Sequence, residues 1–230
     1  MNPPVLTRTR FDAAMVDLDG TLVDTLGDFV AAVNAMLADL HRPGEAHHQL
    51  DAATVGRMVG KGSENLVRAV LAHAGADLPA RYPEAFASYQ RHYAAINGLH
   101  STVYAGGLEG LRTLQQAGLK LACLTNKPLA MARQLLRLKG LDGFFSEVFG
   151  GDSFERKKPD PLPLLKTCEA LGSAPARTLM IGDSSNDARA ARAAGCPVLL
   201  VTYGYNHGEP VREVDADGFL DSLAGLRFQK

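Results

Sequence analysis

The sequence predicts an α/β fold with a Rossmann-like parallel-sheet core, helices on both faces of the sheet, and an inserted all-helical cap domain. Two observations predict it. Short apolar runs alternate with helical segments after about residue 103, which is typical of a parallel sheet covered by helices. One further apolar run lies near the N-terminus and is separated from the rest by a long helical stretch. A chain of 230 residues is long enough for such a core and a smaller insert.

The first strand is expected where the chain first becomes apolar. The run FDAAMVD, from Phe11 to Asp17, is short and is followed by the turn-forming pair Asp19-Gly20. This pattern predicts a buried strand that ends at Asp17 or Leu18. A helix is expected next, over residues 26–40, because its apolar residues recur at helical spacing.

The following stretch contains helical patterns and no convincing strand. Helices are predicted over residues 51–59, 63–74 and 81–96. The simplest explanation is a helical cap, residues 24–102, inserted after the first strand. The catalytic core would then comprise residues 1–23 and 103–230.

Strands and helices alternate through the rest of the chain. We predict helices over 108–117, 129–138, 161–171 and 186–194, and strands over 120–125, 147–149, 177–181 and 197–201.

Composition excludes several classes of protein. The chain has 24 basic and 25 acidic residues and a net charge of −1, so it lacks the basic surface of a nucleic-acid or anionic-membrane binder. It shows no secretory signal and no run of membrane-spanning length. The odd number of cysteines, three, in apolar or helical surroundings favours a reducing cytoplasm. The expected partner is a small molecule, and the sequence gives no indication of oligomeric state.

Polar residues follow the predicted strands at four places. Ligands bind beyond the carboxyl ends of parallel strands, so these places are expected to form one site. They are Asp17-Leu18-Asp19-Gly20-Thr21, Thr125-Asn126, Lys157-Lys158-Pro159 and Gly182-Asp183-Ser184-Ser185-Asn186-Asp187.

The residue types at these places suit phosphoryl transfer. Asp17 and Asp19 lie two apart at a strand end, so one carboxylate can attack while the other moves a proton. With Asp183 and Asp187 they form an acidic cluster that requires a hard cation with oxygen ligands, and Mg²⁺ fits best. Donors such as Thr125 and Lys158 would stabilise the charge of the phosphoryl group.

The four motifs DLDGTLVDT, LTN, KKPDP and GDSSNDARAARAAG resemble, in content and order, those of the haloacid dehalogenase-like superfamily. The resemblance implies that Asp17 is the nucleophile and a metal ligand. It implies that Asp19 is the general acid/base, with a carbonyl that also binds the metal. Further implied roles are phosphate binding by Thr125 and Asn126, charge stabilisation by Lys158, metal binding by Asp183 and support from Asp187.

The helical segment, with Gly60-Lys61-Gly62 inside it, and the stretch from Tyr104 through GGDSFERKKPDPLPLL look like those of the bacterial phosphoglycolate phosphatases. This narrower resemblance implies 2-phosphoglycolate as substrate. Gly60, Lys61 and Gly62, just before a predicted helix, would grip the substrate carboxylate, since a helix N-terminus favours anions. A flexible turn between helices explains the same residues equally well.

Other functions must be weighed against this one. The core motifs also suit a phosphosugar mutase or a phosphatase for another small monoester. A true dehalogenase is disfavoured, because halide displacement needs no proton shuttle such as Asp19. A non-enzymatic phosphoacceptor or binding module is the rival from a different class, and Asp19 argues against it too.

Overall fold

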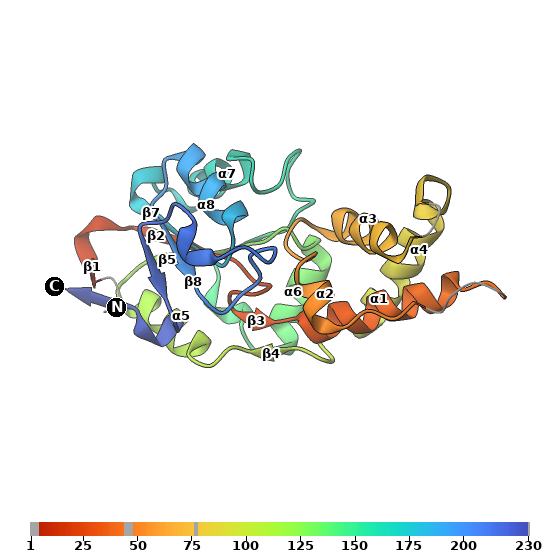
Figure 1. The fold of residues 1–230 in the computed structure, drawn as a ribbon. Helices are drawn as coiled ribbons and strands as arrows, with labels where there is room; N and C mark the ends of the chain where they lie inside the picture. Colours follow the sequence, from red (N-terminus) through yellow and green to blue (C-terminus); the bar gives the residue numbers. More distant parts are fainter. Residues whose placement is uncertain (1–4, 44–47, 76–77, 230) are drawn as a thin grey trace.

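A six-stranded parallel sheet forms the centre of the larger part of the molecule (Figure 1). The computed structural model describes residues 5–43, 48–75 and 78–229. The strand order is β6-β5-β2-β7-β8-β9. The strands are β2 (Ala13–Val16), β5 (Lys120–Leu124), β6 (Glu147–Phe149), β7 (Thr178–Gly182), β8 (Val198–Val201) and β9 (Gly218–Leu220).

Strand β2 lies in the middle of this sheet. Its residue Val16 pairs with Cys123 of β5 on one side and with Ile181 of β7 on the other. All four residues of β2 are fully buried, as expected for a strand covered on both faces. Because the strand order reverses around β2, a crevice opens beyond the carboxyl ends of β2, β5 and β7.

Helices cover both faces of the sheet, which confirms the predicted fold class. Successive side chains of a strand point to opposite faces. Ala14 and Val16 share an apolar cluster with α5 (Gly107–Gln116) and α6 (Leu129–Leu138). Met15 packs instead with α7 (Leu162–Leu171) and α8 (Ser185–Ala194).

Four helices form a separate block beside the sheet, at the right of Figure 1. They are α1 (Leu26–Leu40), α2 (Ala52–Gly56), α3 (Ser63–Ala74) and α4 (Leu78–Ile96). Their buried side chains, among them Phe29, Val67 and Tyr89, form an apolar cluster apart from those of the sheet. Helices α1 and α3 match the prediction, whereas α2 is shorter than the predicted 51–59 and α4 begins before residue 81. We call α1–α4 the helical block.

Two short strands join the helical block to the sheet. β3 (Val23–Asp24) and β4 (Thr102–Val103) pair antiparallel, with Val23 opposite Val103. The sequence did not predict them, because two-residue strands have no measurable period. The predicted boundaries at 23/24 and 102/103 fall within this pair. Just beyond it, the buried Asp28 accepts hydrogen bonds from the backbone amides of Gly98, at 2.8 Å, and His100, at 2.7 Å.

The sequence also missed three short strands near the chain ends. β9 extends the main sheet, and β1 (Val5–Thr7) pairs with β10 (Arg227–Gln229) in a separate two-stranded sheet. Each is only three residues long, so its sequence carries little alternation; β6, of the same length, was predicted because it falls within the regular alternation of strands and helices. Cys123, Cys168 and Cys196 are buried and form no disulfide. Within the described ranges, the helices are too short or too polar to cross a bilayer.

Candidate active site

Asp17 and Asp19 lie in a tight turn directly after β2. The Asp17 amide donates to the Ile181 carbonyl at 2.9 Å and so continues the pairing of the strands. The chain then turns at Gly20, which has a φ of +83°. A Cβ atom at Gly20 would lie 2.1 Å from an oxygen of Asp183. Glycine therefore provides both the left-handed backbone and the space for the neighbouring carboxylate.

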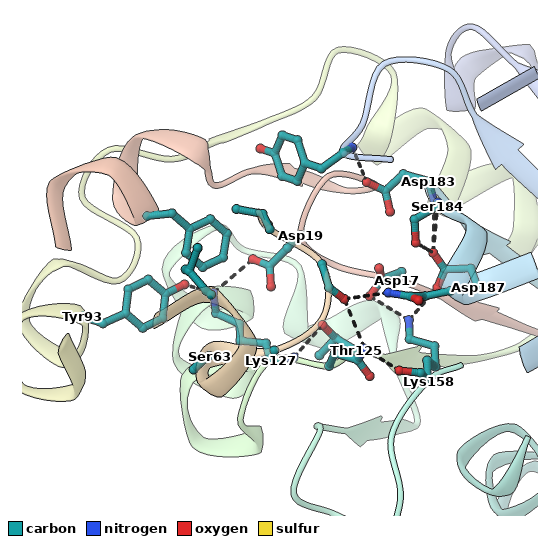
Figure 2. A pocket seen from close by; sticks show the side chains of 18 residues that line it. Asp17, Asp19, Ser63, Tyr93, Thr125, Lys127, Lys158, Asp183, Ser184 and Asp187 are labelled. Atoms are coloured by element: carbon teal, nitrogen blue, oxygen red, sulfur yellow. Dashed lines mark hydrogen bonds and ion pairs between the residues drawn. The ribbon is translucent and has the colours of Figure 1, made fainter. Parts of the chain in front are cut away.

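Three buried carboxylates and one ammonium group converge at this edge of the sheet (Figure 2). Asp17, Asp183 and Asp187 each place a carboxylate oxygen within 4.8 Å of the others. Lys158 Nζ lies 2.7 Å from Asp187 Oδ1 and 3.1 Å from Asp17 Oδ1. Four residues from three distant segments of the chain thus meet at one point.

The cluster holds more negative than positive charge, and this imbalance shifts its pKa values. The pKa of Asp17 is raised to about 7, mainly by burial; Lys158 opposes the rise, and the charges of Asp187 and Asp19 add to it. Burial also raises the pKa of Asp183, with added repulsion from Asp187 and Asp17. The pKa of Lys158 is raised too, because its carboxylate neighbours outweigh the effect of burial.

The donor set fits a magnesium ion. Asp17 Oδ1 is buried and accepts no hydrogen bond, since its contact with Lys158 lacks hydrogen-bond geometry. Asp187 is already engaged at both oxygens, Oδ1 by Lys158 and Oδ2 by the Ser184 hydroxyl at 2.8 Å. Oxygen-rich sites with excess negative charge favour hard divalent cations. Asp17 and Asp183 are therefore the carboxylates best suited to hold Mg²⁺, with Asp187 as their support.

Asp187 also caps the helix that follows it. Its Oδ2 accepts the backbone amide of Ser184 at 3.2 Å, in a capping box at the start of α8. In such a box the side chains of the first residue and of the residue three positions on each accept a backbone amide at the helix start. The cap holds Asp187 in place beside Lys158.

Asp19 points away from the carboxylate cluster toward a second lysine (Figure 2). Its Oδ1 lies 3.0 Å from Lys127 Nζ. Lys127 also donates to the hydroxyl of Tyr93 in α4. The sequence had singled out neither Lys127 nor Tyr93. Lys127 could have been found from sequence, because it directly follows the Thr125-Asn126 pair. Tyr93 could not, because nothing in the sequence distinguishes it from other residues of its helix.

Thr125 and Asn126 follow β5 and bind neighbouring loops. The Thr125 hydroxyl accepts the Lys127 amide at 3.2 Å. The Asn126 side-chain amide donates to the carbonyl of Lys158, at 2.9 Å, and to that of Gly60, at 3.2 Å. Asn126 thereby links the lysine loop of the core to the helical block.

The three predicted residues of the helical block are divided between two places. Gly60 and Gly62 line the same cavity as Asp17 and Asp19. Lys61 instead lines an adjoining hollow of about 700 Å³, together with Arg189 and other polar residues. Of the three, only the glycines lie beside the carboxylates.

The cavity at the centre of the site is small, about 40 Å³. All the other predicted site residues line it: Asp17, Asp19, Thr125, Asn126, Lys158, Asp183 and Asp187. The wall also includes Ser184 and Asn186 of the predicted strand-end segment, and residues that the sequence did not single out, namely Phe29, Val59, Ser63, Leu66, Tyr93, Lys127 and Tyr205. Most of these come from the helical block, whose packing on the core is not visible in a linear pattern.

Comparison with known proteins places the chain in a family. Residues 11–195 match the model of the haloacid dehalogenase-like hydrolases. A phosphoglycolate phosphatase of Thiobacillus denitrificans is 46% identical over 215 residues, 92% of each chain. One from Nitrosospira multiformis is 44% identical over 216 residues, with the same coverage.

A solved structure shows the same architecture. The crystal structure of a predicted phosphoglycolate phosphatase from Haemophilus somnus aligns with a TM-score of 0.82 and 33% identity. The alignment covers 94% of this chain and 96% of that one. The match over most of the chain, together with the strand-end motifs, shows that this protein belongs to the haloacid dehalogenase-like hydrolases.

Proposed function

We propose that this hydrolase is a Mg²⁺-dependent phosphatase that cleaves 2-phosphoglycolate to glycolate and phosphate. The convergence of Asp17, Asp183, Asp187 and Lys158 at one point carries the proposal. The choice of substrate is supported by the phosphoglycolate phosphatases that resemble this chain over 92% of its length.

The reaction begins with attack by Asp17. A carboxylate oxygen of Asp17 bonds to phosphorus as the bond from phosphorus to the ester oxygen breaks, which leaves an aspartyl-phosphate. The departing alkoxide takes a proton from Asp19, and the product alcohol leaves. Asp19 then removes a proton from water, which attacks the same phosphorus, frees Asp17 and releases phosphate.

Other residues of the cavity stabilise charge during these steps. Lys158, between Asp17 and Asp187, faces the developing charge on the phosphoryl oxygens, and Thr125 and Asn126 hold the same group. Asp17 and Asp183 would hold Mg²⁺, with a carbonyl ligand from Asp19. When bound there, Mg²⁺ would supply positive charge that screens the phosphoryl oxygens and lowers the barrier to attack.

The helical block acts in this proposal as a cap. A cavity needs roughly 10–15 Å³ for each water it holds, so 40 Å³ holds only a few waters. A phosphate ester is larger, so in this proposal the helical block moves away from the core to admit it. Closure would then exclude bulk water from the acyl phosphate.

The test is a panel of small phosphate esters, with Mg²⁺ and with a chelator, that includes 2-phosphoglycolate and several sugar phosphates. Phosphate release should require Mg²⁺ and be fastest with 2-phosphoglycolate. Asp17→Asn should lower it by at least about a thousand-fold, whereas the exposed Asp142→Asn serves as the matched control.

The alternative functions would differ from a phosphatase in their products or in the lifetime of the phosphate adduct. Mass spectrometry of acid-quenched protein should detect a transient phosphate adduct on the peptide that holds Asp17. Isomerisation of a sugar phosphate would identify a mutase, and halide release from a haloacid a dehalogenase. An adduct that persists for hours without turnover would identify a phosphoacceptor and refute the phosphatase.

A further inference from the structure

A second buried ammonium group, that of Lys127, lies at the end of the cavity opposite Lys158 (Figure 2). The Lys127 side chain is 2% exposed. Its Nζ lies 5.2 Å from the ring centre of Phe29 and 4.6 Å from that of Tyr93. Both rings come from the helical block, which therefore completes an aromatic enclosure around a cation of the core.

Lys127 has only one anionic partner in this enclosure. Asp19 Oδ1, at 3.0 Å, is the single carboxylate that forms an ion pair with it among the residues that the structure describes. Burial of an ammonium group is costly unless its charge is compensated. The carboxylates of the cluster surround Lys158 instead. The cavity thus has one cation, Lys158, beside the carboxylate cluster and another, Lys127, at its far end.

The position of Lys127 relative to Asp19 suggests its ligand. In the proposed reaction Asp19 protonates the leaving oxygen, so a group next to that oxygen lies near Asp19. In 2-phosphoglycolate a single methylene separates the leaving oxygen from a carboxylate. An ammonium group in contact with Asp19 is therefore within reach of that carboxylate.

We propose that Lys127 is a specificity-determining residue that binds the carboxylate of the leaving group. This inference rests on the proposed phosphatase function and identifies the substrate class as phosphate monoesters with an anionic group one carbon from the ester oxygen. Ser63 lines the same cavity at the N-terminus of α3. Its hydroxyl and the helix end add a favourable environment for the anion.

Lys61 is the competing candidate, since it is the lysine of the glycine-flanked turn. It lines the adjoining hollow instead of the cavity that holds Asp19. Lys127 could also act only by positioning Asp19. Substrate charge separates these roles, because a positioning residue affects charged and uncharged esters alike.

The experiment compares kcat/KM for 2-phosphoglycolate and for ethyl phosphate, which has a methyl group in place of the carboxylate. The wild type should prefer 2-phosphoglycolate, and Lys127→Met should lower the ratio of the two values by about 30-fold or more, as expected for loss of a buried charge pair. Lys127→Arg should keep part of the preference. The exposed Lys166→Met is the matched control and should keep the wild-type ratio.

Several outcomes would overturn the inference. Equal losses on both esters in Lys127→Met would make Lys127 a positioning residue for Asp19. If Lys61→Met lowers the ratio of the two kcat/KM values and Lys127→Met does not, the substrate carboxylate is bound by Lys61. A wild type that hydrolyses both esters without preference would refute carboxylate binding with no variant needed.

A replacement variant and an inhibition measurement complete the experiment. If Lys127→Met fails to fold by circular dichroism, Lys127→Gln, which keeps a polar head group, replaces it. An independent measurement is the inhibition of ethyl phosphate hydrolysis by glycolate in the wild type. We expect glycolate to inhibit, and absence of inhibition at high glycolate contradicts the inference. Hydrolysis of neither ester in the presence of Mg²⁺ would refute the proposed function itself, a separate result.

Discussion

Replacing Lys158 by methionine tests the electrostatics of the site most directly. Methionine has nearly the same length as lysine and no charge. Lys158 Nζ forms ion pairs with Asp187 at 2.7 Å and with Asp17 at 3.1 Å, and it donates to the Leu124 carbonyl at 2.8 Å. Its removal leaves the three buried carboxylates of the cluster without their shared cation.

The expected cost is large because these charges are shielded from water. An ion pair at such distances contributes about 5–6 kcal/mol of Coulomb energy at an effective dielectric constant of 20. Part of this loss is offset, because the variant no longer buries an ammonium group, and such burial itself costs free energy. In the metal-free protein at pH 8, we expect Lys158→Met to lower the free energy of unfolding by about 3–5 kcal/mol. Phosphate release should fall by about a hundred- to a thousand-fold.

The size of the effect should depend on pH and on metal. Protonation of Asp17 and Asp183 removes the repulsion, so the deficit in stability should be smaller at pH 5 than at pH 8. Mg²⁺ should restore part of the lost stability at pH 8, because it supplies positive charge to the same carboxylates. Urea denaturation with chelator or with Mg²⁺ measures both effects.

The exposed Lys166→Met is the control, and it should change the free energy of unfolding by no more than about 0.5 kcal/mol. A deficit below about 1 kcal/mol for Lys158→Met at pH 8, or turnover within threefold of wild type, would show that Lys158 does not balance the cluster.

Three other predictions concern the metal site and the joint with the helical block. Gly20→Ala forces a left-handed backbone on alanine and crowds Asp183, so calorimetry should show Mg²⁺ affinity reduced by about tenfold or more; unchanged affinity would contradict this. Asp17 has an ordinary pKa of 3.8 that burial raises to about 7, so the metal-free protein should lose stability as pH rises between these values. Mg²⁺ binds the deprotonated form, and the rise in Tm that it causes should therefore be greater at pH 8 than at pH 5; an equal rise would refute the assignment. The Tyr205 hydroxyl accepts two backbone amides at the start of α1, at 2.9 and 3.0 Å, so Tyr205→Phe should lower the free energy of unfolding by about 1–3 kcal/mol in urea denaturation, and no loss would mean that these amides find other partners.

The strand-end residues of the site could be predicted from sequence because parallel strands present their carboxyl ends at one edge. Asp17, Thr125 and Asp183 each follow a short apolar run, and adjacent strands bring these runs together whatever the details of packing. The helical spacing of apolar residues predicted the bounds of α1, α3 and α6 as the structure has them. Five strands of two or three residues (β1, β3, β4, β9 and β10) were not predicted, because their pairing depends on neighbours distant in the chain.

Only the tertiary structure decided which side chains complete the cavity. Tyr93 of α4 reaches Lys127, and Lys61 lies outside the cavity although it stands between two glycines that line it. These outcomes depend on how the helical block packs against the core, and hence on side-chain directions set by contacts between segments far apart in sequence. The order of apolar and acidic residues thus determined the sheet and its acidic edge, whereas packing between the two parts determined the far end of the cavity.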